Sequence, residues 1–254
     1  MIPIRDENPS STRPVVTMAL IVANVVAFLL ELLALGPVGP GLIQSFGVVP
    51  ARLLSDPVGE SWTVFTSMFM HGGWEHLGGN MLFLYIFGDN VEDALGHKRF
   101  LGFYLLSGLA AAAAQVFVSP DSMVPMVGAS GAIAGVLGAY LVLYPRAPIH
   151  VLNPIPPLWL LLGFFFVLPA WIVVGEWFVW NMLHGVGSLA SPGMGGVAFF
   201  AHIGGFVVGL LAIKPMLLGR GQRTRATWKR FRPPPRVRPP RGDTGTFRDP
   251  WFPG

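Results

Sequence analysis

Residues 197–218 read VAFFAHIGGFVVGLLAIKPMLL, and their only charged side chain is Lys214. A helix that crosses a bilayer needs about 20 mostly apolar residues, and this stretch provides them. It also carries His202, which lies three residues before Gly205 and therefore on the same helical face. Because ionisable groups inside a bilayer are energetically expensive, such a histidine indicates function. The stretch predicts a transmembrane helix that carries a reactive side chain.

The composition of the chain also indicates a membrane protein. Of its 254 residues, 52% are hydrophobic and 12% are charged, and the mean hydropathy is +0.58. Soluble domains carry about 25% charged residues, so a soluble globule of this size could not cover its surface with so few. The chain has no cysteine, which excludes disulfides and thiolate chemistry.

Several further segments are apolar enough for the bilayer, although 129–143 is short and 76–95 begins and ends with polar side chains. The expected spans are 15–35, 76–95, 100–118, 129–143, 158–182 and 197–218. We therefore expect an all-α membrane protein whose membrane domain, residues 15–218, is a bundle of six transmembrane helices. Residues 1–14 are expected to form a cytoplasmic tail, and residues 219–254 a basic, proline-rich cytoplasmic tail.

Positive charge orients this bundle, because Lys and Arg are enriched in cytoplasmic loops. With six spans and both termini cytoplasmic, 16 of the 17 Lys and Arg residues lie inside and only Arg52 lies outside. Residues 1–219 hold 7 basic and 11 acidic side chains, so the basic character belongs to the tail and indicates topology or anionic lipid, not nucleic acid. We expect an integral multi-pass protein of a bacterial-type plasma (inner) membrane.

Polar side chains on three expected helices fall near one outer level of the membrane. They are His76, Asn80, Ser130 and His202. A serine becomes a nucleophile when a neighbouring histidine takes its proton, and a helix N-terminus such as that at Ser130 can stabilise an oxyanion. The GxxxG pairs Gly131/Gly135 and Gly205/Gly209 would let the two helices approach closely. The alternative is that these polar groups only hold helices together.

These residues resemble the motifs of the rhomboid family. Residues 74–81, WEHLGGNM, match its His-x-x-x-Asn pattern, and residues 128–131, GASG, match Gly-x-Ser-Gly. Residues 201–205, AHIGG, with Gly209 match Ala-His-x-x-Gly, and the resemblance covers about 71–211. Rhomboids are six-helix intramembrane serine proteases that cleave transmembrane substrates with a Ser–His dyad.

The resemblance implies a role for each motif. Ser130 would be the nucleophile and His202 the general base, with an oxyanion hole formed by His76, Asn80 and the backbone N–H of Ser130. The supporting motif residues would be Gly128, Ala129, Gly131, Gly205 and Gly209. The resemblance implies no metal and no organic cofactor, and it implies transmembrane proteins and the lipid bilayer as partners; the oligomeric state stays open.

Other features are left open by the sequence. Some rhomboids have an aromatic residue at the position of Ala134 that supports the histidine ring, so what orients His202 here is undetermined. Access could be controlled by a glycine-rich lid at 185–196 or by the aromatic fifth span, which could equally be only lipid-facing. His71 is expected at the membrane interface, and Glu176 and His184 have no assigned role.

Other functional classes fit less well. A zinc metalloprotease needs His-Glu-x-x-His, which the chain lacks, and an aspartyl protease needs two facing carboxylates, whereas Asp89 has no partner at its depth. A transporter would line a path with polar residues instead of grouping them at one level. The main alternative is a catalytically silent rhomboid-like protein that binds or escorts membrane clients; such proteins typically lack the serine or the histidine.

Overall fold

The structure is a computed structural model that describes residues 1–35, 40–153, 157, 163–190 and 198–219. The chain divides into a unit of residues 1–219 and a second unit of residues 220–254. Apart from Gly219, the predicted basic tail therefore lies outside the described residues. So does half of the predicted lid, residues 191–196, whereas its first half, residues 185–190, is helical instead of a loop.

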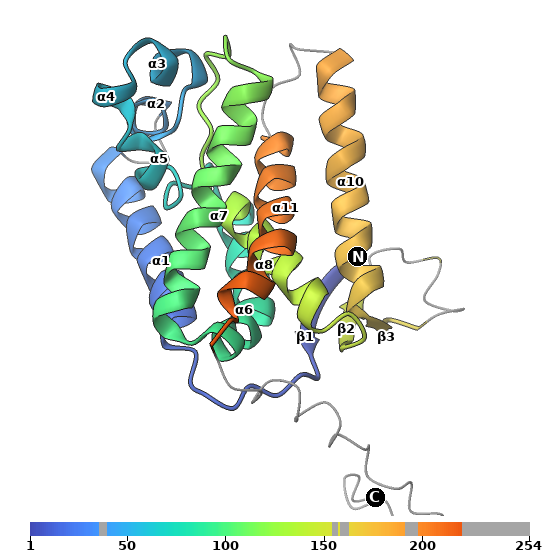
Figure 1. Cartoon of the computed structure of the whole chain (residues 1–254). Coiled ribbons are helices and arrows are strands. Elements are labelled where there is room, and N and C mark those ends of the chain that lie inside the picture. Colours follow the sequence, from blue (N-terminus) through green and yellow to red (C-terminus); the bar gives the residue numbers. More distant parts are fainter. Residues whose placement is uncertain (36–39, 154–156, 158–162, 191–197, 220–254) are drawn as a thin grey trace, which may run out of the picture. The chain divides into compact units, whose positions relative to one another are not determined.

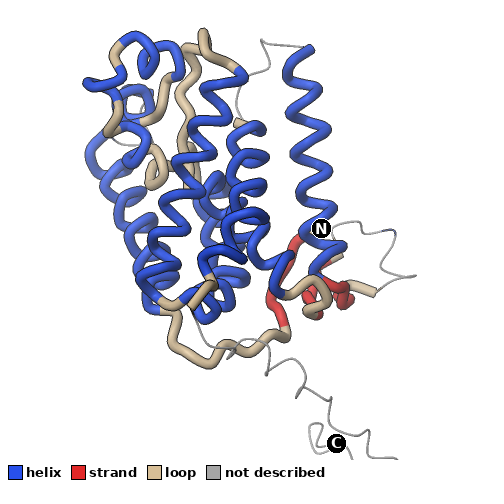
Figure 2. The backbone as a smooth tube through the Cα atoms, viewed as in Figure 1, coloured by secondary structure: helices blue, strands red, loops and turns tan. Residues whose placement is uncertain are grey.

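The first unit is mostly helical (Figures 1 and 2). Its long helices are α1 (Val15–Leu35), α6 (Trp74–Leu95), α7 (His97–Val118), α8 (Ser130–Leu143), α10 (Ala170–Ala190) and α11 (Phe199–Met216). Within the described ranges, α1, α7 and α11 are the three helices that are long and apolar enough to cross a membrane. The mostly helical architecture is confirmed, whereas six crossings and the side of each terminus remain predictions.

Helix α8 is short but central. It contacts α6, α7, α10 and α11, and Figure 1 shows it among these helices. Every residue from Gly131 to Tyr140 is buried. A helix that is apolar on all sides is stable when protein surrounds it, which explains why this segment is apolar although it is too short for an ordinary span.

The fifth predicted span differs from the structure. Residues 165–169 form strand β3 (Phe165–Pro169), and the helix begins at Ala170. A short apolar run is compatible with either a strand or a buried helix. Pro169 disfavours helical geometry at Leu168, and the aromatic and β-branched residues before it suit a strand. Hydropathy alone therefore placed the start of this helix about three turns too early.

Strand β3 belongs to a small antiparallel sheet. Its partners are β2 (Pro148–Leu152) and β1 (Ile2–Asp6), in the order β1-β2-β3. Residues 2–6 of the expected N-terminal tail are therefore a paired strand. Because β3 runs directly into α10, the sheet attaches the start of this helix to the segment that follows α8.

The loop between α1 and α6 contains four short helices. They are α2 (Pro40–Phe46), α3 (Pro50–Ser55), α4 (Pro57–Glu60) and α5 (Thr63–Thr66). Proline favours a helix start, and α2, α3 and α4 each begin with one. Arg52 forms two hydrogen bonds with Glu60, at 3.0 and 2.6 Å. An isolated bridge between Val48 and Met126 attaches this loop to the segment before α8.

Candidate active site

Ser130 and His202 meet between α8 and α11. The Ser130 hydroxyl oxygen lies 2.7 Å from Nε2 of His202. Ser130 is the first residue of α8, and His202 lies in the first turn of α11. The helix start at Ala129 has no side-chain cap, and the first backbone N–H groups of a helix have no intrahelical partner. The hydroxyl thus lies beside both a base and an electropositive helix end.

Glycines make this close approach possible. A Cβ on Gly205 or Gly209 would overlap the carbonyl oxygen of Gly131 or Gly135, respectively. A Cβ on Gly131 would lie 2.5 Å from the Cβ of Ala111 on α7. The stripes of small residues therefore bring the backbones of α8 and α11 into direct contact, which larger side chains would prevent.

The second ring nitrogen of His202 also has a partner. Its Nδ1 lies 2.5 Å from Oδ1 of Asn181 on α10. The Asn181 side-chain NH2 donates to the Trp177 carbonyl at 2.8 Å, and the Trp177 ring lies 5.7 Å from the His202 ring between centroids. The orientation of His202, left open by Ala134, thus comes from α10. The sequence signal that was missed is a lone amide in an apolar helix, which is costly unless it is bonded.

The side chains of His76 and Asn80 both lie beside Gly128, two residues before the start of α8. A Cβ on Gly128 would lie 2.6 Å from Nε2 of His76 and 3.5 Å from Nδ2 of Asn80. Gly128 also has φ +118°, which side-chain-bearing residues rarely adopt. The Gly72 backbone N–H donates to Nδ1 of His76 at 3.4 Å, so Nε2 carries the proton that faces Gly128. Two donors therefore lie next to the Ser130 end of α8.

His71 contributes to the site indirectly, through a contact with Asn80. The prediction that His71 lies at the membrane interface did not include this contact. Its side chain is 0% exposed. Its Nδ1 lies 3.1 Å from the Phe69 carbonyl oxygen and must donate to it, so Nε2 accepts from the Asn80 amide at 3.0 Å. Burial, with a smaller contribution from His76, lowers the pKa of His71 to about 4. A neutral His71 thus holds Asn80 by one of its two amide hydrogens.

A cavity of about 200 Å³ lies beside these groups. Ser130, His202 and His76 reach it, and its other walls include Met68 and Met126. The Gly128 backbone N–H donates to the Ser67 carbonyl at 2.8 Å, which holds the wall before α8 in place. The space lies next to the serine hydroxyl and is lined by both polar and apolar side chains.

The arrangement contains the parts of an acyl-transfer site. It provides a hydroxyl bonded to an imidazole, a partner for the second imidazole nitrogen, and donors near a helix N-terminus. In the part of the chain that the structure describes, no group of three or more His, Asp or Glu side chains is arranged to hold a metal ion.

The sequence of this chain is similar to those of known proteins. The Rhomboid domain model matches residues 58–218. Rhomboid protease AarA of Providencia stuartii is 27% identical over 211 residues, which is 77% of this chain and 70% of that protein. Rhomboid protein 1, mitochondrial, of Saccharomyces cerevisiae is 30% identical over 165 residues (63% and 43%). Rhomboid protease GluP of Bacillus subtilis is 35% identical over 129 residues (51% and 24%). The chain therefore spans less than half the length of the yeast and Bacillus relatives.

Proposed function

Because this chain belongs to the rhomboid family and is an integral membrane protein, we propose that it is an intramembrane serine endopeptidase. It hydrolyses peptide bonds of transmembrane substrates near the outer membrane boundary with a Ser–His dyad. The observation that carries the proposal is the 2.7 Å distance between Oγ of Ser130 and Nε2 of His202.

The first half of the proposed reaction forms an acyl-enzyme. Ser130 gives its proton to Nε2 of His202 while Oγ attacks the carbonyl carbon of the scissile bond. Negative charge develops on the carbonyl oxygen. His202 then gives the proton to the leaving amine nitrogen, the carbon–nitrogen bond breaks, and the substrate carbonyl remains as an ester on Ser130.

The second half returns the enzyme to its starting state. A water molecule gives a proton to His202 as its oxygen attacks the ester carbonyl. The bond to Oγ breaks, the acid product leaves, and His202 returns the proton to Ser130. In both halves, His76 Nε2–H, the free amide hydrogen of Asn80 and the backbone N–H of Ser130 stabilise the oxyanion. Each such donor contributes about 3–4 kcal/mol in serine hydrolases.

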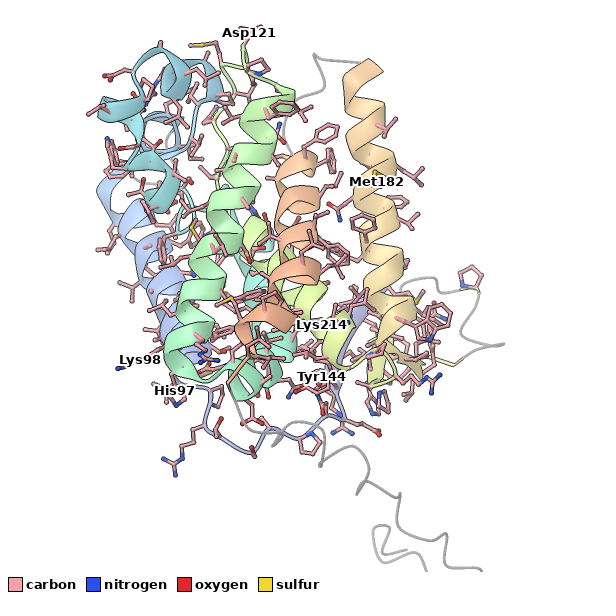
Figure 3. The ribbon with its side chains drawn as sticks, in the orientation of Figure 1. His97, Lys98, Asp121, Tyr144, Met182 and Lys214 are labelled. Carbon is pink, nitrogen blue, oxygen red and sulfur yellow. The ribbon has the colours of Figure 1, made fainter. Side chains whose placement is uncertain are left out.

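In the proposed topology, the chain crosses a bacterial-type plasma membrane six times, and both termini lie on its cytoplasmic side. In Figure 3, Lys98 and Lys214 lie towards one end of the helices and Asp121 lies at the other, which is where this topology expects the two lysines. Ser130 starts α8 at the end of the α7–α8 loop that contains Asp121. The site thus faces the outer side under this topology.

Covalent labelling tests the nucleophile directly. Detergent-purified protein should react with a fluorophosphonate, gain one adduct in intact mass, and cleave a transmembrane substrate. Ser130→Ala should abolish both, whereas Ser122→Ala, in the loop before α8, should retain both. Absence of an adduct, with wild type and Ser130→Ala equally inactive on several substrates, would contradict the enzyme and favour the client-binding alternative.

A further inference from the structure

Asn181 is the side chain that completes the hydrogen bonding of His202. It lies on α10, away from all three sequence motifs, and is 6% exposed. Its Oδ1 lies 2.5 Å from Nδ1 of His202, while Nε2 of the same ring lies 2.7 Å from the Ser130 hydroxyl. The three side chains therefore form a continuous chain of hydrogen bonds that joins α10, α11 and α8.

The orientation of the Asn181 amide follows from its second contact. Its NH2 group donates to the Trp177 carbonyl at 2.8 Å, one turn earlier on α10. The reversed amide would put two oxygens against each other at Trp177 and an NH2 group against the ring. A buried amide is costly when its polar atoms are unpaired, so the paired orientation is strongly preferred. Oδ1 therefore faces His202.

This orientation determines where His202 carries its proton. A carboxamide oxygen only accepts hydrogen bonds, so Nδ1 must carry the hydrogen. A neutral imidazole has one N–H, which leaves Nε2 with its lone pair directed at Ser130. The opposite tautomer would place an N–H against the serine and leave Nδ1 without a proton to give to Asn181.

We propose that Asn181 is a positioning residue that holds His202 in the tautomer able to accept the Ser130 proton. The inference deepens the proposed proteolysis and rests on it for its catalytic consequence. Asn181 does not touch the substrate bond; it acts through His202. When His202 becomes positively charged during the reaction, the Nδ1–H contact with the Asn181 oxygen also strengthens.

Substitution separates this role from packing. Asn181→Leu keeps the approximate size of the side chain but removes the acceptor, and it should lower kcat about tenfold to a hundredfold with little change in KM. Asn181→Asp restores an acceptor and should recover most of kcat. His184→Leu is the matched control, because His184 also bonds the carbonyl one turn earlier on α10, at 2.8 Å, but contacts Trp180 and Phe199.

A spectroscopic readout is independent of turnover. In protein labelled with 15N-histidine, the His202 signals, assigned by their loss in His202→Gln, should show a protonated Nδ1 and an unprotonated Nε2. In Asn181→Leu they should shift towards the other tautomer, and in His184→Leu they should not move.

The two readouts also distinguish failure of the inference from failure of the proposed function. Wild-type kcat or unchanged His202 nitrogen signals in Asn181→Leu would overturn the role of Asn181. So would an equal loss of kcat in Asn181→Asp and Asn181→Leu. If the wild-type protein cleaves nothing but the tautomer still depends on Asn181, the proteolysis is wrong and the positioning contact stands.

Discussion

At the scale of single residues, the neutral state of His71 makes the stability of the fold depend on pH. Burial lowers its pKa to about 4, from the usual 6.5. Between these values the unfolded chain binds a proton that the folded chain does not. The contribution of His71 to stability is therefore fully present above pH 6.5 and is lost as the pH falls towards 4. Protonation of His71 would also place an N–H on Nε2 against the N–H of the Asn80 amide, so that two donors would face each other.

This linkage can be measured by thermal unfolding. The wild-type protein should lose up to about 3 kcal/mol of stability through His71 between pH 7 and pH 4. In His71→Gln that part of the pH dependence should be missing, whereas the exposed His184→Gln should keep it. Parallel stability curves for wild type and His71→Gln across this range would contradict the assignment.

At the scale of elements, the contact between α8 and α11 sets the geometry of the site. Gly209 lies against the Gly135 carbonyl, two turns along α11 from His202. A methyl group there must push the helices apart, which costs about 1–3 kcal/mol in a well-packed interior. Because Ser130 and His202 are on these two helices, the same displacement should lengthen their hydrogen bond.

Gly209→Ala should therefore lower both the melting temperature and the cleavage rate, the latter by at least about tenfold. The control is Gly102→Ala on α7, where a Cβ would meet no atom of the described residues within 4 Å. A melting temperature and a rate that are the same for the two variants would show that the close approach is not needed.

At the scale of the whole molecule, the absence of native cysteine makes the topology directly testable. Lys98 is the second residue of α7, Asp121 lies three residues beyond its other end, and both are exposed. In intact cells, a membrane-impermeant maleimide should label Asp121→Cys. Lys98→Cys should react only after the membrane is permeabilised, because the positive charge is expected inside.

Lys214→Cys, near the end of α11, should behave like Lys98→Cys, and the wild-type protein should not react. Labelling of Lys98→Cys from outside would reverse the proposed orientation. Different accessibility of positions 98 and 214 would contradict the six-crossing arrangement, in which both lie on the cytoplasmic side.

Much of this molecule could be predicted from local sequence. The resemblance carried by three short motifs is confirmed by the Rhomboid domain model over residues 58–218, and the mostly helical fold is confirmed too. The predicted start of the fifth span was wrong. The residues before Ala170 are as apolar as those of a transmembrane helix, but they pair with β2 as strand β3. The roles of Ser130, His202, His76 and Asn80 stay predictions that labelling and kinetics can test.

Apolar helices, family membership and candidate site residues can be recognised along the chain, because run length and motif spacing are local properties. The partners of His202 and Asn80 cannot. Asn181 reaches His202 from another helix, and buried His71 reaches Asn80 from the segment before α6. Such contacts arise only when α10 packs on α11 and that segment folds inward. The tertiary structure therefore decides which nitrogen of each histidine carries the proton, since a tautomer depends on what lies opposite each ring nitrogen.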